Sequence, residues 1–181
     1  AVISTGPLKK VLTLVPFGDG GAGVCGFASI GDTSEVNEYL NSRAGKQALP
    51  PDAVFVWDAK PKKDDNGNFT REVELFTIKM PRSGEAQLTG KAVTDAKSDI
   101  NPETSGYIIN LSMDSQGAST WRKMTGRNVD RPLGIVLDNK MVSAPNVVNE
   151  IAGGNTQISG SFTAQEATDI ANILEIGSLP A

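Results

Sequence analysis

The chain has 181 residues, with 17 basic and 21 acidic side chains, one cysteine and no histidine. The absence of histidine excludes Ser-His-Asp and Cys-His nucleophile systems and removes the most common metal ligand. One cysteine forms neither an internal disulfide nor a structural zinc site. The formal net charge of −4 argues against a nucleic-acid or anionic-membrane partner. We expect no cofactor, and only carboxylate chemistry, a calcium site or no catalysis remain open.

The length suits one medium domain or two small ones, and it is sufficient to bury a core without disulfides. No apolar run approaches the roughly 18 residues that span a bilayer. The sequence starts without Met or a signal-peptide pattern, and it stops directly after a predicted helix. We therefore expect it to be a piece of a larger protein.

The first half predicts the order β-α-β-β. Asp32 and Glu35 have the spacing of a helix N-cap and its supporting carboxylate, and Val36, Tyr39 and Leu40 follow at helical spacing. Residues rich in β-branched and aromatic side chains flank a polar turn. The expected elements are a strand at 24–30, a helix ending at Gly45, and a hairpin of strands 54–57 and 72–80 around a turn at 60–68.

The second half repeats this order and adds a further strand and helix. Thr163 and Glu166 form a capping box, which precedes an apolar helical stripe and a C-terminal cap at Gly177. Residues 81–105 are polar and are assigned no regular element. The expected elements are a strand at 107–113, a helix from Asp114 or Ser115 to Gly126, strands 133–137 and 140–143 joined at 138–139, a strand at 156–162, and a helix with the stripe Ala167, Ile170, Ala171 and Leu174. This pattern predicts an α+β protein with helices packed on antiparallel sheet.

Two short motifs resemble ligand-binding loops. Residues 18–23 match the G-x-G-x-x-G pattern of dinucleotide sites, but the predicted strand at 24–30 stands where that motif requires a helix. The acidic run at 64–68 suggests calcium, yet the positions that need glycine and glutamate hold Phe69 and Leu75. We interpret the first motif as a linker and the second as a hairpin turn.

The remaining candidates are single residues. Asp58, after Trp57, is the one carboxylate that follows an apolar run closely enough for a raised pKa. Cys25 lies in a predicted strand, where a small buried hydrophobic role is the default. Trp57 and Trp121 are expected in the core or an interface. We therefore predict no catalytic, cofactor-binding or metal-binding residue and no enzyme activity.

Several motifs in the second half resemble the first large periplasmic domain of the SecD and SecDF family of protein-export membrane proteins, of the Bacteroides type. The similarity covers about 88–181, and residues 1–87 resemble the more variable head insertion of that domain. Four residues depart from the family pattern in ways that suit turns and strands: Asn139, Ala152, Ser159 and Ser161. The motifs are Leu133-Gly-Ile-Val-Leu-Asp-Asn-Lys-Met-Val-Ser-Ala-Pro145, Ile151–Phe162, Thr163–Ala167, Ile176–Pro180, Tyr107–Asn128 and Leu88-Thr-Gly90.

The resemblance implies two subdomains. Residues 1–87 would form a smaller β-α-β-β head with an N-terminal linker. Residues 88–181 would form the C-terminal part of a ferredoxin-like base, with an antiparallel sheet and helices on one face.

The resemblance also implies a function. The domain would lie on the periplasmic side of the bacterial inner membrane, within a multi-pass protein that assists proton-gradient-driven translocation by contacting the emerging polypeptide. The implied partners are unfolded preprotein, SecYEG, SecF or a fused SecF half, and YajC. The family's proton-carrying residues lie in transmembrane helices, so none is assigned in this sequence, and no polypeptide-binding residue is identified.

Two other hypotheses remain open at this point. The chain could be an extracytoplasmic binding module for carbohydrate or peptide, without a role in export, which predicts clustered surface aromatic residues. A carboxylate-dependent enzyme would require two carboxylates that converge in a cleft.

Overall fold

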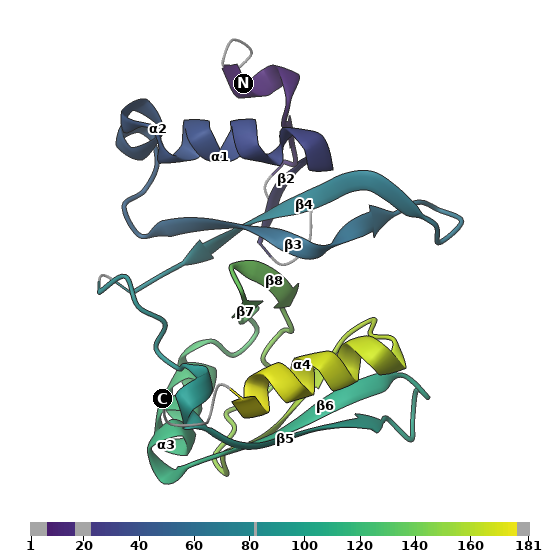
Figure 1. The fold of residues 1–181 in the computed structure, drawn as a ribbon. Helices are drawn as coiled ribbons and strands as arrows, with labels where there is room; N and C mark the ends of the chain where they lie inside the picture. Colours follow the sequence, from purple (N-terminus) through teal and green to yellow (C-terminus); the bar gives the residue numbers. More distant parts are fainter. Residues whose placement is uncertain (1–6, 17–22, 82, 177–181) are drawn as a thin grey trace. The chain divides into compact units, whose positions relative to one another are not determined.

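The computed structural model describes residues 7–16, 23–81 and 83–176. The chain divides into two compact units, which Figure 1 colours by sequence: Ala1–Glu85 with Gly134–Val142, and Ala86–Leu133 with Ser143–Ala181. Both units combine helices with sheet, which confirms the α+β class. The division differs from the two contiguous segments expected from the sequence, because residues 134–142 return to the first unit. Within the described ranges, no helix is long and apolar enough to cross a membrane.

The first unit is built on a six-stranded sheet. Its strand order is β1-β2-β4-β3-β8-β7, so the late hairpin β7–β8 extends a sheet made by the first 80 residues. The β1–β2, β2–β4 and β3–β4 pairs are antiparallel, whereas β3 and β8 pair in parallel. The strands are β1 (Thr13–Leu14), β2 (Val24–Ser29), β3 (Ala53–Lys63), β4 (Phe69–Lys79), β7 (Ile135–Leu137) and β8 (Lys140–Ser143).

One face of this sheet packs against helix α1 (Thr33–Asn41). Trp57 and Leu75 are directly opposite each other on β3 and β4, and the side chains there alternate between the two faces. Both residues join a buried cluster with Val36 of α1, whose exposed fraction is 0%. The side chains on one face of the strands and those on one side of α1 therefore pack into a single buried core.

The structure corrects the predicted end of this helix. The chain bends at Ser42, and a second helix, α2 (Arg43–Ala48), follows. The Ser42 hydroxyl accepts a hydrogen bond from the Gly45 N–H at 3.0 Å, so Ser42 caps α2 and Gly45 lies inside it. A Cβ at position 45 would collide with the backbone oxygen of Tyr39, which explains the glycine. The expected cap at Asp32 forms no side-chain hydrogen bond, because a short 3-10 turn (Ile30–Asp32) leads into α1.

The β3–β4 hairpin is confirmed, but it is longer than predicted. β3 continues through Lys63, so only residues 64–68 form the turn. An Asp64 carboxylate oxygen accepts hydrogen bonds from the N–H groups of Asn66 and Asn68, both at 2.9 Å. Gly67 has a φ of +81°, which the turn requires and glycine adopts without strain.

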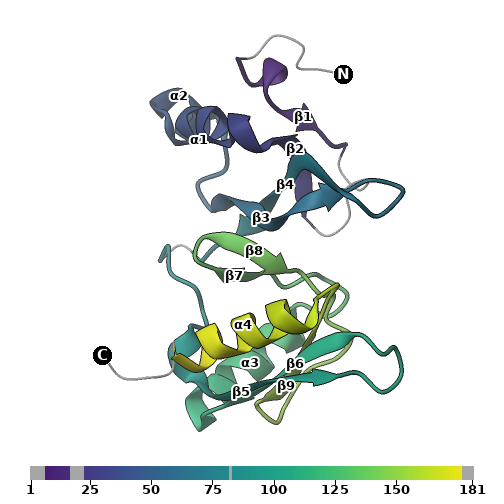
Figure 2. The ribbon, with the colours of Figure 1, turned by 45° about the vertical axis from the view of Figure 1, so that its right-hand side comes forward.

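The second unit contains a three-stranded antiparallel sheet in the order β5-β6-β9, seen in Figure 2. β5 was not predicted, because only Val93 and Ala96 of its eight residues are buried and its apolar pattern is weak. The ferredoxin-like arrangement stays a prediction. The elements are β5 (Val93–Ile100), β6 (Tyr107–Met113), α3 (Ser115–Arg127), β9 (Asn155–Ser159) and α4 (Ala164–Ile176).

Helix α4 packs against β5 and β6. The predicted capping box is confirmed, since the Thr163 N–H donates to the Glu166 carboxylate at 2.7 Å and the Glu166 N–H donates to the Thr163 hydroxyl at 3.3 Å. The predicted stripe is buried at all four positions, Ala167, Ile170, Ala171 and Leu174. The predicted cap at Gly177 lies outside the described residues.

The predicted turn at residues 138–139 is also confirmed. Asp138 and Asn139 have φ angles of +47° and +59°, the left-handed conformation of a tight hairpin turn. At the other end of this hairpin, in the second unit, the Leu133 N–H donates to the Pro145 oxygen at 3.0 Å.

Thr125 is a fully buried polar residue of α3 that links the helix to the loop before β9. Its hydroxyl donates to the Trp121 oxygen at 2.9 Å, and it accepts a hydrogen bond from the Ile151 N–H at 3.0 Å. Asp114 caps the start of the same helix by accepting from the Gly117 N–H at 2.6 Å. The Thr125 hydroxyl oxygen thus fixes the backbone at Ile151, where no strand in the described residues pairs with the loop.

We predict that Thr125→Val destabilises the second unit by about 1–2 kcal/mol, because valine matches threonine in shape but leaves the Ile151 N–H without its partner. Urea unfolding followed by circular dichroism measures this difference. Thr120→Val is the matched control, since the Thr120 hydroxyl donates only back to Gln116 within the helix. Its effect should stay below about 0.5 kcal/mol. Equal losses for both variants would contradict the role of Thr125.

Candidate functional site

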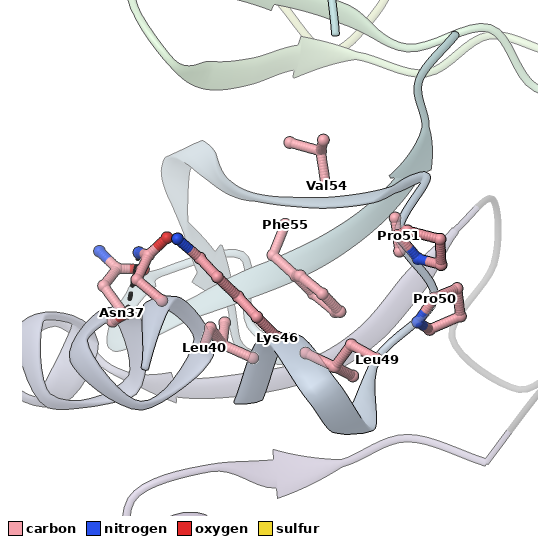
Figure 3. Close-up of a pocket in the computed structure, with 10 residues that line it drawn as sticks. Asn37, Leu40, Lys46, Leu49, Pro50, Pro51, Val54 and Phe55 are labelled. Atoms are coloured by element: carbon pink, nitrogen blue, oxygen red, sulfur yellow. Dashed lines mark hydrogen bonds between the residues drawn. The ribbon is translucent and has the colours of Figure 1, made fainter. Parts of the chain in front are cut away.

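A pocket of about 430 Å³ lies in the first unit, between α1, α2 and the start of β3 (Figure 3). Its walls are mainly apolar, and Asn37, Asn41 and Lys46 add polar groups. The apolar lining residues are Leu40, Leu49, Pro50, Pro51, Ala53, Val54 and Phe55.

Local sequence features build this pocket. The bend at Ser42 turns α2 away from α1, and Pro50-Pro51 then separates α2 from β3. Two prolines in succession restrict the backbone to extended and turn conformations, so the chain cannot continue the helix. The Ala53 N–H donates to the Pro50 oxygen at 3.1 Å, which fixes the turn into the strand.

Asn37 is the best-anchored polar group of the pocket. Its side-chain oxygen accepts a hydrogen bond from the buried Trp57 indole N–H at 2.9 Å. Its backbone oxygen accepts one from the Asn41 side chain, also at 2.9 Å, and this bond is drawn in Figure 3. The helical wall of the pocket is therefore tied directly to the sheet.

The pocket has the volume and composition of a site for apolar groups with a few polar contacts. The side chains of Leu40, Leu49 and Phe55 gather between the helices and β3, whereas the Val54 side chain leaves the opposite face of the strand (Figure 3). The amide groups of Asn37 and Asn41 and the ammonium of Lys46 supply donors to carbonyl or carboxylate oxygens. This arrangement suits noncovalent contact with an extended apolar chain rather than bond cleavage.

The structure gives Asp58 a partner that the sequence analysis missed. Asp58 follows Trp57 on β3, and Glu74 precedes Leu75 on β4, so both carboxylates lie on the face opposite the helix. Burial raises the pKa of Asp58, although the Lys60 N–H, which donates to its carboxylate at 2.8 Å, and the charges of Lys60 and Lys140 oppose the shift. Combining strand alternation with the hairpin register would have revealed this pair.

Glu74 is affected by the same surroundings. Burial raises its pKa, the negative charge of Asp58 raises it further, and the ammonium of Lys62 lowers it. In the part of the chain that the structure describes, no group of three or more acidic or cysteine side chains has the geometry to hold a metal ion. Asp58 and Glu74 are thus two neighbouring half-buried carboxylates with lysine side chains nearby.

The other sequence candidates lie elsewhere. The run 18–22 falls outside the described residues, and Asp64 stabilises the hairpin turn. Cys25 lies on β2, where its thiol donates to the Leu75 oxygen at 3.3 Å and burial raises its pKa, which disfavours the reactive thiolate. Trp57 belongs to the core of the first unit. Asp64, Cys25 and Trp57 do not line the pocket.

We predict that Asp58→Asn stabilises the chain at neutral pH. A carboxyl group with a raised pKa in the folded state binds its proton more tightly there than in the unfolded chain. The free energy of unfolding therefore falls as pH rises from the ordinary carboxyl pKa of about 4 through the raised value. Asparagine keeps the acceptor for the Lys60 N–H without the buried charge. Urea unfolding of both proteins across this pH range should show a difference that disappears at low pH; a constant difference would contradict the assignment.

A model of the family described as the SecDF P1 head subdomain matches residues 71–181. These residues include 88–181, which the sequence analysis assigned to the base, and exclude residues 1–70 of the expected head. The family match therefore attaches the description "head" to a different part of the chain than the sequence analysis did.

Curated relatives agree with this family. The chain is 34% identical over 159 residues to the protein translocase subunit SecD of Calditerrivibrio nitroreducens, covering 84% of this chain and 30% of the relative. It is 34% identical over 176 residues to SecD of Rhodothermus marinus, covering 97% and 26%. SecD of Magnetococcus marinus is 40% identical over 164 residues, covering 90% and 30%. The chain thus spans less than a third of the length of these relatives.

Solved structures show the same fold. A structure of SecDF, described as a membrane component that enhances protein export, aligns with a TM-score of 0.51 at 24% identity, covering 77% of this chain and 71% of that one. A crystal structure of SecDF in a super-membrane-facing form aligns with a TM-score of 0.50 at 25% identity, covering 94% and 19%. The family model, the relatives and the fold agree, and the chain belongs to the SecD/SecDF family as part of its first periplasmic (P1) domain.

Proposed function

We propose that this chain acts on the periplasmic side of the bacterial inner membrane, where it contacts polypeptide emerging from the Sec channel and so assists its export. The proposed partners are unfolded preprotein, SecYEG, SecF or a fused SecF half, and YajC. The chain contributes contact surface rather than catalysis, and the proton gradient acts through membrane-embedded parts of the whole protein.

The pocket of the first unit is the observation that carries this proposal. An unfolded polypeptide presents apolar side chains beside unpaired backbone carbonyl groups. The pocket offers apolar walls for the side chains, and Asn41 and Lys46 are donors for the carbonyl oxygens. Such recognition is independent of sequence, as a protein that handles many preproteins requires.

A carbohydrate-binding module is the alternative class. Carbohydrate sites commonly use aromatic rings as stacking platforms beside polar side chains. The pocket contains one aromatic side chain, Phe55, among aliphatic residues and prolines. The lining therefore favours the peptide ligand.

We predict that Leu49→Asp in the full-length protein reduces the stimulation of preprotein translocation into inner-membrane vesicles by about tenfold. A carboxylate at this wall would have to lose water when an apolar segment enters, which opposes binding. Because Leu49 is half-buried at the C-terminal end of α2 and lies outside the buried cluster of the sheet, the substitution leaves the core of the unit in place.

Ile100→Asp is the matched control, since Ile100 is 53% exposed on β5 of the second unit, outside the pocket. It introduces the same charge in place of an exposed aliphatic residue, and it should leave translocation within twofold of the unmodified protein. Full activity of Leu49→Asp, or equal losses for the two variants, would overturn the assignment of the pocket.

A further inference from the structure

The far end of the β3–β4 hairpin forms an ordered tip that the core does not need. We define the tip as residues 62–71, where the strands continue past the pair formed by half-buried Pro61 and buried Val73. Figures 1 and 2 show its turn extending past the end of α1. At about 3.3 Å per residue, the strands carry the turn about 10 Å beyond the last buried residue.

The tip displays an aromatic ring between two cations. Phe69 is 60% exposed and pairs with Lys63 across the hairpin, and the Lys63 ammonium lies 5.1 Å from the centre of its ring. Arg71 is two residues along β4 from Phe69, so its side chain leaves the same face of the strand. Leaving a phenylalanine this exposed forgoes the stabilisation that burial would give.

Internal contacts hold the tip in one conformation. The Thr70 hydroxyl donates to the Lys62 oxygen at 3.0 Å, and the Lys62 ammonium lies 4.5 Å from the centre of the Phe27 ring on β2. Asp64 holds the turn through two backbone N–H groups. The aromatic and basic groups are therefore presented on a rigid element, and their presentation needs no ordering upon contact.

Charge is distributed unevenly between the tip and the whole chain. The tip, residues 62–71, contains three basic and two acidic side chains, whereas the chain carries a formal charge of −4. Electrostatic interactions are screened over about 8 Å at physiological ionic strength, which is shorter than the reach of the tip. A partner at the tip therefore experiences the local positive charge more strongly than the distant negative charge.

We propose that this tip, through Lys63, Phe69 and Arg71, docks on the surface of a bilayer that contains anionic phospholipids. An aromatic ring flanked by basic side chains suits the headgroup region, where the ring enters the interface and the cations contact phosphate. Because the tip protrudes, it can contact a flat and deformable surface such as a bilayer. A polypeptide ligand is instead held in a groove or along a sheet edge.

Flotation of the 181-residue chain with vesicles tests this proposal. The chain should bind vesicles of phosphatidylcholine with one-third phosphatidylglycerol, and it should bind pure phosphatidylcholine much more weakly. Lys63→Gln and Arg71→Gln should each weaken binding about fivefold, and added salt should weaken binding of the unmodified chain. Phe69→Ser should weaken binding to a similar extent through loss of the ring.

Lys97→Gln and Ile100→Ser are the matched controls, because both residues are exposed on β5 in the second unit. They should leave vesicle binding unchanged. Equal binding to neutral vesicles, or equal losses for the control and tip variants, would overturn the proposal. So would displacement of the chain from vesicles by an acidic polypeptide that binds it more tightly, because the tip would then be a polypeptide site.

Discussion

The hydrogen bond between Trp57 and Asn37 joins the core of the first unit to its pocket. Trp57 is 5% exposed at the centre of the sheet, and its indole nitrogen is the polar atom that burial would otherwise leave unpaired. Asn37 satisfies it from α1, one turn from the residues that form the pocket wall. The packing that stabilises the sheet therefore also sets the distance between the helix and β3, where the pocket opens.

The paired strands β3 and β4 place apolar side chains on one face and two carboxylates on the other. Alternation directs Trp57, Val73 and Leu75 toward α1, and it directs Asp58 and Glu74 to the other face. Burial raises the pKa values of both carboxylates, while neighbouring lysines oppose the shifts. Farther along the same hairpin, past Val73, exposed side chains form the basic, aromatic tip. One hairpin thus connects core, acidic pair and tip.

Much of the fold follows from local signals in the sequence. The capping box at Thr163 and Glu166, the apolar stripe of α4 and the turn at Asp138-Asn139 each depend on neighbours within a few residues, and all are confirmed. β5 was missed because it is a polar strand with two buried residues, stabilised by pairing with β6. The parallel pairing of β8 with β3 joins residues more than 80 positions apart, so no local pattern could place 134–142 in the first unit.

The sequence predicted the family of the chain, but it did not predict the pocket. Motifs in the second half identified the SecD/SecDF family, but the pocket lies in the first half, where Ser42, Gly45 and Pro50-Pro51 determine the path of the backbone. From the sequence, Gly45 predicted only the end of a helix. The role of these residues in opening a pocket depends on the packing of α1 against the sheet, which requires the three-dimensional structure.

We expect the pocket of the first unit to contact polypeptide during export. The most direct measurement is site-specific photo-crosslinking in the full-length protein, with the reactive residue placed at Leu49 in the pocket and, separately, at Ile173, which is 43% exposed on α4. We expect a preprotein arrested during translocation to crosslink at position 49 and not at position 173. Crosslinking of equal strength at both positions, or at position 173 alone, would contradict the account.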